Sequence, residues 1–239
     1  ILQNCFATKY YYGIKKDSEF STKIINNSIE GLKLKIDNQD IFVKLKGKFN
    51  AYNILCVYAG SIILGIKKSN LLKYISQLES PKGRFELIKN RIGPSIIIDY
   101  AHTPDALENV LKTIKEFKIK GKIISLFGAG GNRDKKKRFF MGEIASKYSD
   151  KIVLTTDNPR NEDPLNIIND IKLGIKNKKK LIINVDRKSA IKSTIFNAQS
   201  NDIILIAGKG HEDYQEIKEI KYPFDDKLVV NRILNLMNT

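Results

Sequence analysis

The sequence predicts an α/β protein whose larger part is a mostly parallel sheet with helices on both faces. From about residue 95 onward, short apolar segments alternate with amphipathic stretches of helical period. The apolar segments are continuous rather than alternating, which indicates strands that are buried on both faces. Helix-start pairs, Thr103-Pro104 and Asp163-Pro164, precede two of the amphipathic stretches. We expect strands at 96–100, 122–127, 151–155, 181–185 and 202–207, and helices from about 104, 136, 164 and 188.

Residues 1–90 have a different pattern and predict a separate unit, joined to the sheet by a linker at about 81–95. Alternating residues at 32–36 and 41–45 flank a turn at 37–40, as in a β-hairpin. Two helices follow, one with an apolar face from Ile54 to Ile62 and one over 69–78 capped by Ser69. At the other end, a hairpin around Lys218-Glu219 precedes a last helix capped by Asp225 or Asp226.

Composition bounds the class of protein. The chain has 239 residues, of which 42% are hydrophobic, enough to form a core. Its formal net charge of +16 raises the question of nucleic-acid binding. The lysines are scattered among isoleucines and asparagines along the whole length, so we interpret the charge as a compositional bias. We expect weak binding to polyanions at low salt and no specific nucleic-acid site.

The cellular setting follows from what the sequence contains. Cys5 and Cys56 do not make a disulfide framework, which favours a reducing, cytoplasmic compartment. The longest apolar stretch, 54–66, is too short to span a membrane, and we see no signal peptide. The chain opens at Ile1 without an initiator methionine, which we interpret as a fragment of a longer protein.

Polar residues collect where the expected parallel strands end, which is where open α/β sheets bind ligands. The segments concerned are 99–105, 128–135, 157–160, 186–187 and 208–213, and they hold both histidines and many glycines. Simpler explanations exist for each: Thr103 and Asp163 can be helix caps, and His102 and His211 can be ordinary loop residues. The concentration at one edge nevertheless predicts a ligand site, and an exposed Asp99 carboxylate would suit a ribose diol.

The loop Asp157-Asn-Pro-Arg160 is the most informative of these segments. Pro159 restricts the turn, and Arg160 offers a planar fork suited to a carboxylate or a phosphate. Taken alone, the loop is better explained as a helix-capping segment with one solvated arginine. Other chemistries are disfavoured: Arg133 stands where a dinucleotide fingerprint needs glycine, no P-loop spacing occurs, and two histidines with two remote cysteines do not form a zinc site.

Six motifs in order carry a family resemblance: Phe49-Asn-Ala-Tyr-Asn53, Gly83-Arg-Phe-Glu86, Asp99-Tyr-Ala-His-Thr-Pro-Asp105, Gly130-Gly-Asn-Arg-Asp134, Asp157-Asn-Pro-Arg160 and Gly208-Lys-Gly-His-Glu212. Together they are similar to the Mur ligases of peptidoglycan synthesis, in particular the members that add meso-diaminopimelate. The resemblance implies a C-terminal Rossmann-like domain over 91–239, preceded by the last part of the central ATPase domain over 1–90. The P-loop, the carbamylated lysine and the Mg²⁺ ligands would lie upstream of this chain.

The resemblance also implies site residues. ATP would contact Asn53, Arg84, Asp99 and His102, and diaminopimelate would contact Arg133, Asn158, Arg160, Gly208 and Glu212, with Asp157 and Pro159 shaping the loop. The other implied partners are small molecules: the UDP-N-acetylmuramoyl dipeptide and Mg²⁺-bound ATP. The implied protein is a cytoplasmic monomer without membrane contact. Two departures, Asn132 in place of aspartate and the basic run at 135–139, affect the expected shape of one loop.

The implied reaction is formation of an acyl phosphate from ATP, followed by attack of the incoming amine. We assign no catalytic acid or base in this chain, which would supply positioning and charge stabilisation. Two alternatives stay open: a ligase of the same fold that adds lysine, and a non-catalytic module that binds polyanions. Testing a panel of amino acids as substrates would distinguish a lysine-adding ligase from a diaminopimelate-adding one. Salt-resistant nucleic-acid binding without a response to diaminopimelate would favour the polyanion-binding module.

Overall fold

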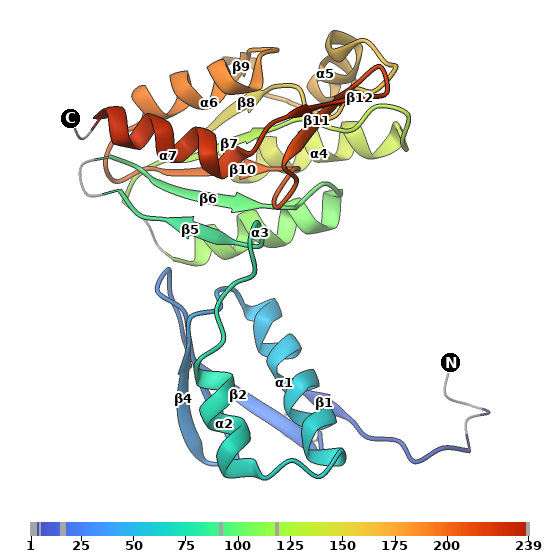
Figure 1. Ribbon diagram of the computed structural model, residues 1–239, viewed down its shortest axis with the longest axis vertical. Coiled ribbons are helices and arrows are strands. Elements are labelled where there is room, and N and C mark those ends of the chain that lie inside the picture. The colour runs from blue at the N-terminus through green and yellow to red at the C-terminus, as the bar shows by residue number, and fades with distance from the viewer. Residues whose placement is uncertain (1–3, 5, 15–17, 91–92, 118–119, 238–239) are drawn as a thin grey trace. The chain divides into compact units, whose positions relative to one another are not determined.

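The chain forms two compact units, Ile1–Glu79 and Ser80–Thr239 (Figure 1). This computed structural model describes residues 4, 6–14, 18–90, 93–117 and 120–237, so Cys5 lies outside the described residues. The second unit begins before the predicted boundary at 90/91, because strand β5 (Glu86–Ile88), within the expected linker, pairs with the following strand of the large sheet. The assignment of the first unit to an ATPase domain stays a prediction.

The first unit is a four-stranded sheet, in the order β1-β2-β3-β4, packed against two helices. Its strands are β1 (Tyr12–Gly13), β2 (Phe20–Asn27), β3 (Leu32–Ile36) and β4 (Gln39–Val43), and its helices are α1 (Lys48–Ile63) and α2 (Lys68–Ser76). The predicted hairpin is confirmed, with left-handed Asp37 and Asn38 forming its two-residue turn. Ser69 is not a cap: α2 begins after Lys67, whose carbonyl accepts the first helical N–H groups.

The second unit contains a six-stranded sheet in the order β5-β6-β10-β7-β8-β9. All five predicted strands are confirmed, as β6 (Ser95–Asp99), β7 (Ile123–Phe127), β8 (Lys151–Leu154), β9 (Leu181–Ile183) and β10 (Ile203–Ala207). These five run parallel, and β5 is antiparallel to β6. Because β10 inserts between β6 and β7, the segments that follow β6, β10, β7 and β8 lie side by side at one edge.

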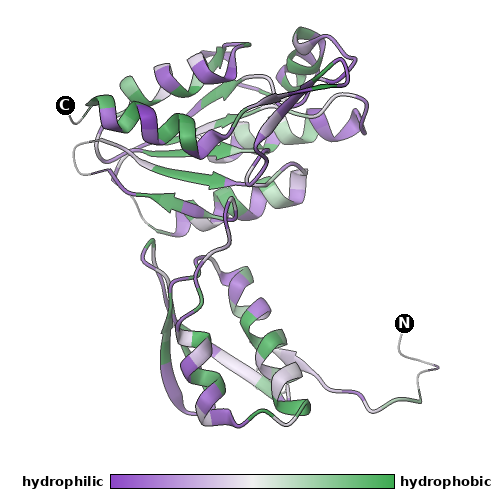
Figure 2. Cartoon of the chain, viewed as in Figure 1, coloured by the Kyte–Doolittle hydropathy of each residue, from purple (hydrophilic) through white to green (hydrophobic). Residues whose placement is uncertain are grey.

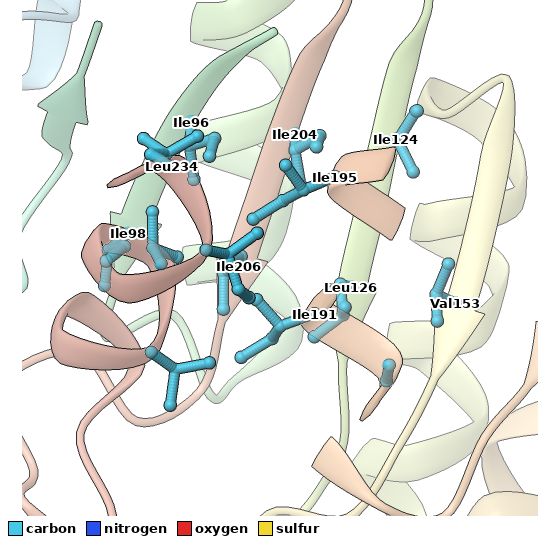
Figure 3. Packing of buried hydrophobic residues seen from close by; sticks show 14 residues of the cluster. Ile96, Ile98, Ile124, Leu126, Val153, Ile191, Ile195, Ile204, Ile206 and Leu234 are labelled. Atoms are coloured by element: carbon cyan, nitrogen blue, oxygen red, sulfur yellow. The ribbon is translucent and has the colours of Figure 1, made fainter. Parts of the chain in front are cut away.

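Helices cover both faces of this sheet, as predicted (Figure 1). On one face α6 (Arg187–Phe196) and α7 (Asp226–Met237) pack against alternate strand residues, with Ile191, Ile195 and Leu234 meeting Ile204 and Ile206 (Figure 3). Helices α3 (Pro104–Glu116), α4 (Lys136–Tyr148) and α5 (Pro164–Leu173) lie on the opposite face. The central residues of these strands are therefore mostly apolar, as their colouring in Figure 2 shows.

Local capping signals explain where several helices begin. Thr103 Oγ1 accepts from the Ala106 amide, and Asp163 accepts from the amides of Leu165 and Asn166, so both predicted caps are confirmed. The predicted second hairpin is present as β11 (Tyr214–Ile217) and β12 (Ile220–Pro223), and Asp225 is the residue that caps α7. A short 3₁₀ turn, Lys178–Lys180, precedes β9.

Two helical glycines predict stability changes of opposite sign. Gly142 in α4 faces α5 so closely that a Cβ would lie 2.0 Å from the Ile171 carbonyl oxygen, whereas a Cβ on Gly60 in α1 would meet nothing within 4 Å. We expect Gly142→Ala to destabilise the second unit by about 1–3 kcal/mol through overpacking. Gly60→Ala should stabilise the first unit by about 0.5–1 kcal/mol. Urea unfolding followed by circular dichroism measures both, and equal signs would contradict the packing described.

Candidate functional site

A cavity of ≈ 450 Å³ lies at the carboxyl edge of the large sheet. The segments after β6, β7, β8 and β10 enclose it, and Tyr214 of β11 closes one side. Six of the seven residues predicted for diaminopimelate line this cavity together with His102, while Pro159 is buried in the supporting loop. The lining residues are Tyr100, His102, Gly130, Arg133, Lys137, Asp157, Asn158, Arg160, Gly208, Glu212 and Tyr214.

A buried lysine organises the inner wall of the cavity. Lys209 is fully buried, and its Nζ donates to Asn158 Oδ1 at 3.0 Å and to Glu212 Oε2 at 3.1 Å. Asn158 Nδ2 donates to the same Glu212 oxygen at 2.8 Å. These bonds set the orientation of both side chains and leave Glu212 Oε1 to accept from a ligand. Sequence reasoning gave Lys209 no role, although its place between two glycines directly after a wholly apolar strand was a usable signal.

The Arg160 segment is held by the hairpin that follows the sheet. Arg160 is left-handed, with φ 51°, and its N–H donates to the Glu216 carbonyl while its own carbonyl accepts from the Lys218 amide. Its side chain, 21% exposed, donates from Nε to Glu216 Oε2 and from Nη1 to the Gly131 carbonyl, both at 2.9 Å. The explanation of Arg160 as a solvated arginine is therefore wrong. The role of Glu216 was not predicted, because no local pattern marks this residue. The Nη2 atom of Arg160 stays available to a ligand.

A second buried cation joins the loop after β7 to the Arg160 segment. Arg138 is fully buried and donates to both carboxylate oxygens of Glu162, to Asp170 and to the Gly130 carbonyl. The Arg138 guanidinium lowers the pKa of Glu162 to about 2. Arg133 is left exposed at the mouth of the cavity.

The departure at Asn132 has a structural explanation. Asn132 is left-handed, with φ 53°, a conformation that asparagine adopts more readily than most residues. Its Oδ1 accepts from the Asn161 amide at 3.2 Å, and the Gly131 amide donates to the Asn158 carbonyl at 2.8 Å. The loop after β7 is therefore fixed against the segment after β8 without an aspartate.

Asp157 and Gly208 meet at the floor of the cavity. Asp157 is 7% exposed, and within the part of the chain that the structure describes its carboxylate receives no hydrogen bond. A Cβ on Gly208, whose φ is +113°, would lie 2.4 Å from Asp157 Oδ2. Glycine is therefore required here, and Asp157 offers the cavity a buried acceptor for a cationic group.

An aromatic stack lies beside the cavity, on the side predicted for ATP. The Arg84 guanidinium carbon is 4.4 Å from the centre of the Tyr100 ring, and that ring is 4.6 Å from His102 and 5.0 Å from His211. Lys137, another residue that sequence reasoning missed, donates from Nζ to the His102 carbonyl, and burial lowers its pKa. Lys137 therefore lies between the stack and the Asp157 side of the cavity.

The prediction that the Asp99 carboxylate is exposed is wrong. Asp99 is 7% exposed, and its two oxygens accept from the amides of Phe85 and Ala101, both at 2.7 Å. Burial raises the pKa of this carboxyl group, although the two amide bonds oppose the rise. Asp99 thus ties the segment before β5 to the end of β6. Asn53 is exposed on α1 of the first unit, where its Nδ2 donates to Asn50 Oδ1.

Comparison with known proteins identifies the family. A family model described as "Mur ligase, glutamate ligase domain" matches residues 83–210, more than half of the chain. The chain belongs to the Mur ligase family. UDP-N-acetylmuramoyl-L-alanyl-D-glutamate–2,6-diaminopimelate ligase of Cytophaga hutchinsonii is 46% identical over 99% of this chain, and that of Aquifex aeolicus is 48% identical over 93%. The chain spans about half the length of these relatives, 49% and 46%.

Solved Mur ligases share the fold. A structure of UDP-N-acetylmuramoyl-L-alanyl-D-glutamate–2,6-diaminopimelate ligase superimposes with a TM-score of 0.68 at 33% identity, over 95% of this chain and 48% of that one. UDP-N-acetylmuramate-alanine ligase of Thermotoga maritima gives 0.67 at 20% identity, over 95% of this chain and 47% of that one. The second match supports the α/β fold alone.

The described residues hold neither an evident metal site nor a membrane-spanning helix. No group of three or more His, Cys, Asp or Glu side chains is placed to hold a metal ion there. None of the described helices is both long and apolar enough to cross a bilayer.

The Arg138–Glu162 pair predicts a pH dependence of stability. A carboxyl pKa lowered from 4.5 to about 2 stabilises the folded state above pH 4.5, and this contribution disappears as the pH falls toward 2. Between pH 5 and 2, the free energy of unfolding should fall more steeply for the unmodified chain than for Glu162→Gln. Urea titrations at several pH values give both slopes, and identical slopes would show that this pair is not formed in solution.

Proposed function

We propose that this chain is the amino-acid-binding part of a Mur ligase that adds meso-diaminopimelate to UDP-N-acetylmuramoyl-L-alanyl-D-glutamate with ATP. One observation carries the proposal: Arg133, Asn158, Arg160, Gly208 and Glu212, from three separate loops, converge on one cavity. The family membership and the names of the most similar relatives support the same substrate.

The charges of the cavity fit a diamino diacid. Diaminopimelate carries two carboxylates and two ammonium groups. The available donors of Arg160 and the exposed Arg133 suit the carboxylates, and the Glu212 and Asp157 carboxylates suit an ammonium. The cavity would therefore offer cationic groups for the ligand carboxylates and acceptors for its ammonium groups.

Selectivity against lysine follows from the distal carboxylate, which lysine lacks. A charge-assisted hydrogen bond contributes about 1.5–3 kcal/mol. With lysine bound, the Arg160 donors would lose both this bond and access to water, a cost that increases discrimination. Glu216 is part of this arrangement because it orients the guanidinium before any ligand binds.

In the proposed reaction, the substrate carboxylate takes the γ-phosphoryl group of ATP and ADP leaves. The neutral diaminopimelate amine then attacks the acyl phosphate, which expels inorganic phosphate and forms the amide with loss of a proton. This chain would orient the amine and stabilise charge, with no acid–base pair assigned. Within the second unit, ATP would lie against Arg84, Tyr100 and His102. Asp99 would act by shaping that wall, since its carboxylate is engaged. Mg²⁺ would be held by residues outside this chain. The ligase would be a cytoplasmic monomer.

Calorimetric titration of the 239-residue chain tests the substrate. We expect meso-diaminopimelate to bind more tightly than lysine. Arg160→Ala should weaken diaminopimelate binding about 10- to 100-fold, the equivalent of the lost charge-assisted bond, and should not weaken lysine binding. Arg232→Ala, which removes an exposed arginine of α7, is the matched control and should leave both affinities unchanged. Equal affinities for the two amino acids in the unmodified chain would refute the substrate assignment.

Enzyme kinetics supply a second test in the full-length ligase that contains this chain. There, Arg160→Ala should raise the KM for diaminopimelate far more than the KM for ATP. Equal effects on both constants would place Arg160 outside the amino-acid site.

A further inference from the structure

An ion pair that no motif includes lies beneath the cavity. Arg187 is the first residue of α6 and Asp226 the first residue of α7, and both side chains have 0% exposure. Arg187 Nε donates to Asp226 Oδ1 and Nη2 to Asp226 Oδ2, both at 2.8 Å. The pair is thus bidentate and removed from water.

The remaining donors of Arg187 reach two main-chain carbonyls. Nη2 donates to the Ala207 carbonyl at 3.1 Å, and Nη1 to the Thr156 carbonyl at 3.4 Å. Ala207 directly precedes Gly208, and Thr156 directly precedes Asp157. The Arg187 guanidinium therefore bonds to the residue directly before each of the two segments that form the inner wall of the cavity.

Sheet hydrogen bonds do not join these two segments directly. Ala207 ends β10 and Thr156 follows β8, and β7 lies between those strands in the sheet. The Arg187 side chain thus reaches across β7 and fixes the distance between the Thr156 and Ala207 carbonyls. The Thr156 hydroxyl and amide both donate to the Val185 carbonyl, which links the segment after β8 to the turn that carries Arg187.

Stability alone does not explain the pair. Burial opposes the charge of Arg187, and the Asp226 carboxylate offsets this by raising its pKa. Buried ion pairs can often be replaced by apolar residues of similar volume without loss of stability, so a directional role is a better explanation. The Thr156 and Ala207 carbonyls, to which Arg187 donates, are the groups that it would hold in place.

We propose that Arg187 and Asp226 are positioning residues for the amino-acid site: they set the distance between the Asp157–Arg160 segment and the Gly208–Glu212 segment. This rests on the proposed function, because the cavity between those segments is the one assigned to diaminopimelate. The pair makes no contact with the ligand. Its effect reaches the ligand through Asn158 and Glu212, whose mutual hydrogen bond depends on that distance.

Arg187→Lys and Asp226→Asn test the role in the 239-residue chain. Lysine keeps the positive charge beside Asp226 but cannot reach both carbonyls and both carboxylate oxygens with a planar fork. We expect each variant to weaken meso-diaminopimelate binding at least tenfold in calorimetry, at a temperature where circular dichroism shows the fold intact. Combining the two should add little to the single effects, because they remove one unit.

The matched control is Leu234→Ala, which loosens the packing of α7 on the sheet without touching the pair. It should lower the unfolding temperature but change diaminopimelate affinity less than twofold. If Leu234→Ala weakens binding as much as the pair variants do, or if the pair variants bind normally, the positioning role is overturned. Failure of the unmodified chain to bind diaminopimelate would instead overturn the proposed function.

An NMR measurement on the unmodified chain tests the positioning role even if the variants do not fold. The Arg187 Nε–Hε group is buried and should give a protected resonance in ¹⁵N-resolved NMR spectra. Saturation with meso-diaminopimelate should shift this resonance, because ligand bonds to Asn158 and Glu212 alter the environment of the two adjoining carbonyls that Arg187 contacts. An unshifted resonance in the presence of bound ligand would contradict the proposal.

Discussion

The contact between Glu216 and the Arg160 segment is the constraint on which the rest of the site depends. One residue of β11 donates its amide to Asn158, offers its carbonyl to the Arg160 amide, and pairs its carboxylate with the Arg160 guanidinium. These bonds compensate for the left-handed conformation of Arg160, which is costly for a side chain with a Cβ. The guanidinium is therefore oriented before a ligand arrives, which lowers the entropic cost of binding.

Buried cations extend the same principle around the cavity. Arg138, Arg187 and Lys209 each lie out of solvent, and each bonds both a carboxylate and a main-chain or side-chain carbonyl of a neighbouring segment. Parallel strands bring four loops to one edge, but loops alone would not hold a cavity open. The buried ion pairs fix the loops relative to one another. The fold therefore determines where the cavity lies, and the ion pairs determine its shape.

Local pattern was enough to predict most elements. Continuous isoleucine runs predicted the parallel strands, and Thr103, Asp163 and Asp225 marked helix starts because capping depends on near neighbours. The family resemblance placed Arg133, Asn158 and Glu212 in a common site. The insertion of β10 between β6 and β7, the burial of Asp99 and the pairing of Glu216 were not predictable, since each depends on contacts distant in sequence.

In the proposed complex, Arg160 contacts the distal carboxylate of a diamino diacid. A crystal structure of the 239-residue chain with meso-diaminopimelate tests this most directly. We expect one ligand carboxylate oxygen within about 3 Å of an Arg160 Nη atom, with the Arg160–Glu216 bond retained. Both ligand carboxylates turned away from Arg160, in a fully occupied cavity, would contradict it.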